Sequence, residues 1–242
     1  MQKKILMKNK KKILIVGSNE DFSLEKMYQR SLLSLGHNVK ILNIYKMHRN
    51  LIIRFFWKFF KNIFFILFNR KLLNYSTKNK NFDLIIIFKG IYLNKNTLKK
   101  VKINWKNAKI INIYTDNPFN INKFTDISSK HVLENISFYD YFFIWSKSLK
   151  NKLEKVFNLN NVFILPFGND EFIHKKFKNS KKKYEYDVSF VGTADKKRIS
   201  VIRKLKDFKI IVAGMGWENV QLGENVIKNS AVSALTTSKI YS

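Results

Sequence analysis

Residues 82–93 read FDLIIIFKGIYL, and the unbroken apolar run at 84–88 decides the fold class. A strand with one face in water alternates apolar and polar residues, whereas a strand buried on both faces is apolar throughout. Strands buried on both faces are typical of parallel sheets covered by helices. The run ends at Lys89 and Gly90, where the chain has to turn. We therefore predict an α/β fold with a parallel sheet.

Similar apolar runs recur before and after this one, with helical patterns between them. The predicted strands are residues 12–17, 38–44, 83–88, 109–115, 140–145 and 162–166. The predicted helices are residues 22–35, 51–73, 97–101, 130–136 and 146–156, the last with Ser146 as its N-cap. Strands that alternate with helices favour right-handed βαβ units. We interpret residues 1–169 as one Rossmann-like domain.

A second α/β pattern follows a charged stretch. Residues 170–185 hold several lysines and no sustained apolar run, so they are interpreted as a linker. The pattern restarts in residues 186–242, with strands at 187–191, 209–213 and near 226, a helix at 196–205 and a last helical start near 234. So short a unit is marginal as a complete domain. The expectation is a chain that carries only the opening part of its second Rossmann-like domain.

Composition excludes several classes of site. The chain has no cysteine, which excludes disulfides, thiol catalysis and Cys-ligated zinc or iron–sulfur centres. The formal net charge is +29, but only six of the 46 basic residues are Arg, and the abundance of Lys, Asn, Ile and Phe is what AT-rich codons produce. Base and phosphate recognition favours the planar Arg side chain. We therefore predict no specific nucleic-acid partner, while leaving a nucleic-acid binder open as an alternative without catalysis.

The segment at 51–68 is apolar and aromatic but carries Arg54, Lys58 and Lys61 on one helical face. Its longest uncharged stretch is too short to span a bilayer. Two interpretations stay open: a crossover helix that packs its aromatic face on the sheet, or a basic amphipathic helix in peripheral contact with an anionic membrane. The expected location is accordingly cytoplasmic, either free or at the inner face of the membrane.

Polar and aromatic residues gather where the predicted strands end, and parallel sheets bind ligands at that edge. The candidates are Lys89, Gly90, Tyr114, Asp116, Trp145, Ser146 and Gly168. Because glycine is scarce in this chain, the glycines that follow apolar runs are expected to mark turns that the backbone requires.

Together, these stretches resemble the CgeB-like glycosyltransferases. The matching segments are FDLIIIFKGIYL (82–93), AKIINIYTDNPFN (108–120), YDYFFIWSKSL (139–149), VFILPFGND (162–170), YDVSFVGTADKKRISVIRKL (186–205) and AGMGW (213–217). The resemblance implies a GT-B architecture of two Rossmann-like domains and transfer of a sugar from a nucleotide-sugar donor to an acceptor whose identity the residues do not give. The family pattern usually has two acidic residues before the proline, and here the second is Asn117.

The resemblance also implies roles for individual residues. Gly192 and Thr193 would bring backbone N–H groups to the donor diphosphate, Arg198 would offer a guanidinium, and the donor side would be lined by Gly214, Gly216 and Trp217. No cofactor is implied and no metal is required, because helix dipoles and basic groups can stabilise the leaving diphosphate.

Two residues are candidates for the base that deprotonates the acceptor. Asp116 comes first, although an Asp-Asn-Pro sequence also forms turns through side-chain hydrogen bonds to the backbone. His131 comes second, with a surface or cap position as its alternative. Lys89 is either a ligand-binding residue or one surface lysine among many.

Overall fold

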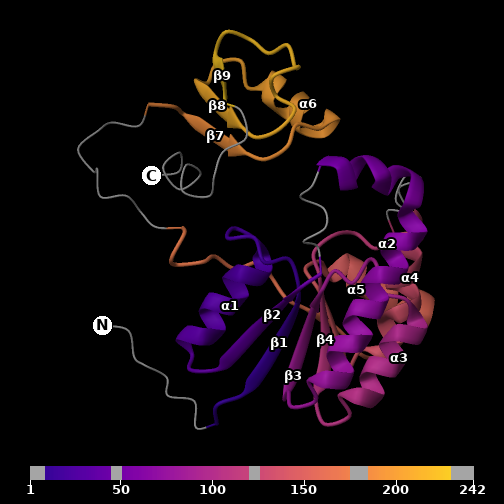
Figure 1. The fold of residues 1–242 in the computed structure, drawn as a ribbon. Helices are drawn as coiled ribbons and strands as arrows, with labels where there is room; N and C mark the ends of the chain where they lie inside the picture. Colours follow the sequence, from indigo (N-terminus) through magenta and orange to yellow (C-terminus); the bar gives the residue numbers. More distant parts are fainter. Residues whose placement is uncertain (1–8, 45–50, 120–125, 175–184, 230–242) are drawn as a thin grey trace. The chain divides into compact units, whose positions relative to one another are not determined.

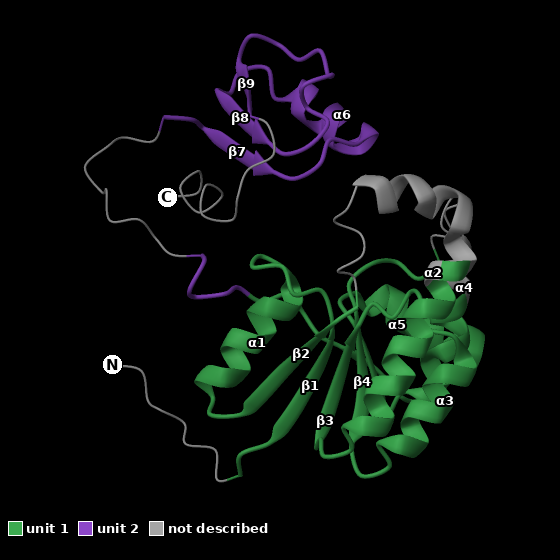
Figure 2. Cartoon of the chain, viewed as in Figure 1, with its two compact units in different colours: residues 1–168 green, residues 169–242 purple. Residues whose placement is uncertain are grey.

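The computed structural model describes residues 9–44, 51–119, 126–174 and 185–229, without the side chains of 51–62, 64 and 126–130. The chain divides into two compact units, Met1–Gly168 and Asn169–Ser242 (Figure 2). The two are described separately below. The helical start predicted near 234 lies outside the described residues.

The first unit is built on a six-stranded parallel sheet (Figure 1). Its strands are β1 (Lys12–Gly17), β2 (Asn38–Asn43), β3 (Leu84–Phe88), β4 (Lys109–Tyr114), β5 (Tyr141–Ile144) and β6 (Val162–Ile164). Their order is β2-β1-β3-β4-β5-β6, and each neighbouring pair is parallel. The order reverses between β1 and β3, which makes this the point where an open α/β sheet offers a crevice.

Helices cover the two faces of this sheet unequally (Figure 1). They are α1 (Leu24–Ser34), α2 (Leu51–Lys78), α3 (Lys95–Asn104), α4 (Asp126–Asn135) and α5 (Lys147–Phe157), with a short 3-10 helix η2 (Ile136–Phe138) before β5. Side chains of α1 pack on one face, and those of the other helices pack on the opposite face. Right-handed crossovers produce this division, because only the β1-to-β2 connection runs in the other direction along the sheet.

The second unit is a smaller parallel sheet of the same kind. It orders β7 (Val188–Val191), β8 (Ile210–Ala213) and β9 (Val226–Asn229), with α6 (Lys196–Lys204) between β7 and β8. Its core is formed around Ile202, Ile210, Val212 and Trp217. The predicted parallel α/β class is confirmed for both units.

Every predicted strand end lies within two residues of the structure, but three helices are longer than predicted. The helix α2 continues to Lys78 because Ser76 and Thr77 bond back to carbonyls three residues earlier, so this polar turn stays helical. The helix α3 starts at Lys95, where Asn94 caps it. The helix α4 starts at Asp126. Ser146 is confirmed as the N-cap of α5, since its side chain accepts from Leu149 N.

An aspartate placed just before a strand ties neighbouring strands together in three places. In each case the aspartate donates its backbone N–H to the carbonyl of a residue at the start of the neighbouring strand in the sheet. Its carboxylate accepts the backbone N–H of the same partner residue. The pairs are Asp83 with Lys12, Asp140 with Ile110 and Asp187 with Lys209. An aromatic residue precedes each aspartate in the sequence. These pairs set the strand register at the amino edge of both sheets.

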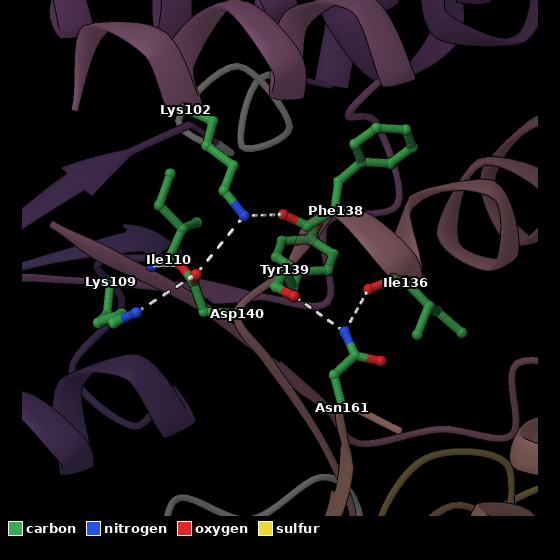
Figure 3. A network of polar contacts seen from close by, with 8 residues as sticks. All are labelled: Lys102, Lys109, Ile110, Ile136, Phe138, Tyr139, Asp140 and Asn161. Carbon is green, nitrogen blue, oxygen red and sulfur yellow. Dashed lines mark hydrogen bonds and ion pairs between the residues drawn. The ribbon is translucent and has the colours of Figure 1, made fainter. Parts of the chain in front are cut away.

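Asp140 carries the most extensive of these contacts (Figure 3). Its carboxylate accepts the Ile110 N–H at 2.7 Å and lies 3.5 Å from Lys102 Nζ and 3.8 Å from Lys109 Nζ. Lys102 also donates to the carbonyl of Phe138. Because α3, η2, β4 and β5 all contribute, this network fixes the helical layer against the sheet at its amino edge.

Candidate functional site

The carboxyl edge of the first sheet contains an ion pair between two of the predicted site residues. Lys89 follows β3 and Asp116 follows β4, and Lys89 Nζ lies 2.9 Å from Asp116 Oδ2. The two side chains are 45% and 58% exposed, so a ligand can reach both. Because β3 borders the point where the strand order reverses, the pair lies beside the crevice expected of an open α/β sheet.

Lys89 has an unusual backbone conformation. Its φ is 58°, in the left-handed region that costs an ordinary residue about 1–2 kcal/mol. Gly90 follows with φ 69°. Among the described residues, Asn158 is the other non-glycine with positive φ, and it ends a helix, where such a conformation is common. Strain of this kind at a strand end is typical of functional turns.

Two buried polar side chains support this turn. Asn112 Nδ2 donates to the carbonyl of Lys89 at 3.4 Å. A Cβ on Gly90 would lie 3.0 Å from Tyr139 Oη and 3.2 Å from Asn112 Nδ2, so only glycine fits without displacing them. Burial raises the pKa of the Tyr139 phenol, and a hydrogen bond with Asn112 lowers it by a smaller amount. The sequence analysis did not include Asn112 and Tyr139 among the site residues. Asn112 could have been recognised, because it is a polar residue inside the apolar strand 109–114.

The turn after β4 is formed by Asn117 rather than by Asp116. Asn117 Oδ1 accepts the N–H of Phe119 at 3.0 Å, which is the turn chemistry considered for its neighbour. The carboxylate of Asp116 instead points to Lys89. Asp116 is therefore exposed and held by a cation.

The other predicted acceptor-side residues differ in accessibility. Tyr114 is 4% exposed and stacks on Phe142, so it belongs to the core. Ser146 uses its hydroxyl to cap α5 and to contact Ser148. Gly168 has open space around it and no positive φ, so nothing local requires a glycine there. Trp145 is 45% exposed and faces the ring of Phe167.

His131 lies inside α4 and does not cap it. Its Nδ1 is 3.3 Å from Glu134 Oε2, and its ring stacks on Phe65 with centroids 4.9 Å apart. These contacts fix the imidazole between α4 and α2. The contacts of His131 match the surface position considered for it more closely than a position beside Asp116.

The loop after β1 holds an acidic side chain where a nucleotide phosphate would have to lie. Glu25 is buried in the first turn of α1, and its Oε1 accepts the N–H of Ser18 at 2.8 Å. A Cβ on Gly17 would overlap this carboxylate. The loop is therefore a tight strand-to-helix turn with its backbone donor already satisfied.

In the second unit, the two glycine turns lie against each other at the carboxyl edge of the sheet. A Cβ on Gly214, whose φ is 138°, would lie 2.4 Å from the carbonyl oxygen of Gly192. The buried Trp217 donates its indole N–H to that same carbonyl at 2.7 Å. Trp217 therefore belongs to the core and positions the turn, whereas the prediction had it lining the donor side. The N–H of Gly216 is bound by the carboxylate of Glu218 at 2.9 Å.

Arg198 is engaged within its own turn. Its Nη1 donates to the carbonyl of Thr193 at 2.6 Å, and its Nε lies 3.2 Å from Asp195 Oδ2. Asp195 is the N-cap of α6. The sequence analysis did not name it, although an aspartate just before a helical run is typical of an N-cap. The guanidinium also lies over the Phe190 ring. Its 45% exposure leaves part of the side chain accessible.

A separate hollow lies at the opposite edge of the first sheet. It measures about 590 Å³ and is lined by Lys12 and Asn38 at the starts of β1 and β2, and by residues 77–82 at the end of α2 and just beyond it. Since parallel sheets bind ligands at their carboxyl ends, this amino-edge hollow is not part of the candidate site.

The described residues contain no group of three or more His, Asp or Glu side chains that could hold a metal ion. Nor do they contain a helix that is long and apolar enough to cross a bilayer. The proposed membrane contact through Arg54, Lys58 and Lys61 falls on side chains that are not described, although the backbone there is helical.

No protein-family profile and no curated protein sequence matches this chain. Several solved structures are similar in backbone. TarM of S. aureus, solved with UDP, shares 15% identity over 68% of this chain and 37% of its own length, with a TM-score of 0.44. The Streptomyces glycosyltransferase SsfS6 shares 10% identity over 94% of this chain and 74% of its own, with a TM-score of 0.45. The UDP-GlcNAc 2-epimerase of Methanocaldococcus jannaschii shares 12% identity over 94% of this chain and 75% of its own length, with a TM-score of 0.48. At such identities the similarity says nothing of substrate.

Proposed function

We propose that this chain is a glycosyltransferase of the CgeB-like, GT-B kind, whose first unit binds the acceptor and whose second unit binds a nucleotide-sugar donor. The observation that carries the proposal is the ion pair of Lys89 and Asp116, a reachable carboxylate at the ligand-binding edge of a parallel sheet. The second unit repeats the parallel design and has glycine turns at the same edge.

Asp116 is the proposed base. A general base needs a carboxylate within reach of the proton it abstracts, and Asp116 presents an exposed carboxylate that Lys89 holds at 2.9 Å. Asp116 would take the proton of an acceptor hydroxyl while the hydroxyl oxygen attacks the anomeric carbon of the donor sugar. The bond from that carbon to the diphosphate breaks, and the nucleoside diphosphate leaves with the electron pair.

The glycine turns of the second unit are the proposed diphosphate site. The N–H of Gly216 already binds a carboxylate, that of Glu218, so this backbone donor is suited to an anionic oxygen. Gly192 and Thr193 lead into the N-terminus of α6, which favours negative charge. In this proposal Arg198 holds Thr193 in place and turns its remaining N–H groups toward the phosphate.

Backbone amide shifts of the intact chain, followed by NMR during a titration with UDP, test this assignment. We expect saturable shifts at Gly192, Thr193, Gly214 and Gly216, and about tenfold weaker binding for Arg198→Ala. Arg203→Ala is the matched control, because Arg203 lies on the same helix and contacts Gln221 instead. Shifts confined to other residues, or none at saturating nucleotide, would overturn the donor site.

A further inference from the structure

Two large aromatic side chains are exposed just beyond the carboxyl ends of β5 and β6. The rings of Trp145 and Phe167 are stacked, with centroids 6.3 Å apart and an angle of 26° between their planes. At this separation the rings are offset, and the side chains remain 45% and 61% exposed. Two adjacent strands therefore present a platform of two exposed aromatic rings to solvent.

The platform shares its edge of the sheet with the ion pair. The strands β3, β4, β5 and β6 are consecutive neighbours, and all four run in parallel. Lys89 and Asp116 follow the first two of these strands, and Trp145 and Phe167 follow the other two. One row at the carboxyl edge therefore combines a charged pair with an apolar surface.

A pyranose ring fits this combination of surfaces. One face of the ring presents C–H groups, which gain free energy when they are buried against an aromatic ring. Its rim carries hydroxyl groups, which hydrogen-bond to a carboxylate and an ammonium. The indole N–H of Trp145 makes no hydrogen bond within the described part of the chain and is a further donor for a hydroxyl.

The surroundings of the platform argue against a nucleobase as its occupant. Single-stranded nucleic acids bind where aromatic side chains alternate with cations that follow the phosphates. Within the described residues, no Lys or Arg lies over the ring of Trp145 or Phe167. The rings that do have a cation over them are those of Phe119, Phe138, Tyr186 and Phe190.

We propose that Trp145 and Phe167 form a stacking platform for a pyranose ring, so that the acceptor is itself a carbohydrate or carries one. This inference rests on the proposed function and narrows its substrate class. The platform holds the ring while the neighbouring Asp116 meets one of its hydroxyls.

Saturation-transfer NMR on the intact chain tests the platform without any donor. The probes are methyl β-D-glucopyranoside, glycerol as a polyol that lacks a ring, and a short thymidine oligonucleotide. We expect saturation of the ring C–H protons of the glucoside and none for glycerol. Trp145→Ala and Phe167→Ala should each weaken glucoside binding about tenfold, while Trp145→Phe keeps most of it.

Ile103→Ala is the matched control, since Ile103 is an even more exposed apolar residue on α3, at 72%, and its loss should leave binding unchanged. Equal saturation in wild type and Trp145→Ala would overturn the proposal. So would the absence of any glucoside signal from the folded chain, or binding of the oligonucleotide alone. Because no nucleotide is present, failure here is distinct from failure of the donor site, which the UDP titration reports.

Discussion

Lys89 and Asp116 lie on loops after neighbouring strands and meet at 2.9 Å, although they are 27 residues apart in the sequence. Both side chains are about half exposed, and a surface ion pair of this kind contributes about 1 kcal/mol or less to stability. The pair is therefore poorly explained as a stabilising contact. A role in ligand binding explains the ion pair better, because the pair lies beside the crevice of the sheet.

The first prediction separates activity from folding. Asp116→Asn should lower the rate of sugar transfer about 10²–10⁴-fold, because the base is removed. Urea denaturation should show a free energy of unfolding within about 1 kcal/mol of wild type. Asn117→Ala removes the adjacent turn contact and serves as the control. A large loss of stability in Asp116→Asn with full activity would show that the residue is structural.

A second prediction concerns the strained backbone of Lys89. Glycine adopts φ 58° without penalty, so Lys89→Gly should stabilise the first unit by up to about 1 kcal/mol. The same change removes the cation and should reduce transfer. Thermal unfolding and transfer rates measure the two effects. If Lys89→Gly destabilises the unit, the strain assigned to this turn is absent.

The third prediction is for the glycine contact in the second unit. Gly214→Ala places a Cβ 2.4 Å from the Gly192 carbonyl oxygen and should destabilise this unit by about 2–4 kcal/mol. Gly168→Ala meets nothing within 4 Å and should change stability by less than about 1 kcal/mol. Hydrogen exchange of the backbone amides of β7 and β8, followed by NMR, measures unfolding of this unit. Equal stability of the two variants would contradict the close approach.

Asp140 provides a fourth prediction. Asp140→Ala leaves the N–H of Ile110 without its acceptor and should cost about 1–3 kcal/mol in urea denaturation. Asp140→Asn keeps an oxygen that can accept this N–H but loses the charge that faces Lys102, so its cost should be smaller. Equal losses in the two variants would mean that the ion pairs, which both variants lack, outweigh the strand contact.

The fifth prediction is a pH dependence. Burial raises the pKa of Tyr139 in the folded chain, whereas the unfolded phenol titrates near about 10. Its contribution to stability is thus complete below about pH 10 and is lost above it, by about 1.4 kcal/mol per pH unit. Tyr139→Phe should flatten that part of the decline. The same decline in wild type and in Tyr139→Phe would contradict the assignment.

The sequence was sufficient to predict the strands, because buried parallel strands have continuous apolar runs that end at glycine or polar residues. It also predicted a helix cap with local chemistry, Ser146 at the start of α5. Helix ends were harder to predict. At Ser76 and Thr77, polar side chains bond to their own helix and resemble a terminus.

The candidate site depends on strand order, which a single sequence does not contain. Lys89 and Asp116 were separate candidates, and only the adjacency of β3 and β4 brings them together. Tyr114 was a candidate because it lies at the end of a predicted strand, and Trp217 was one because the family resemblance implied it. Burial cannot be read from position alone, and the structure places both in the core. The partners of Arg198 come from the local turn of the second unit.

The most direct test of the central claim is release of nucleoside diphosphate from a nucleotide sugar by the intact chain. UDP-glucose, UDP-N-acetylglucosamine and GDP-mannose would be offered with methyl β-D-glucopyranoside, and the products followed by mass spectrometry. The account predicts a glycosylated product and free diphosphate with one donor, both strongly reduced in Asp116→Asn. Turnover that is the same in wild type and Asp116→Asn, or no binding of any donor, would contradict it.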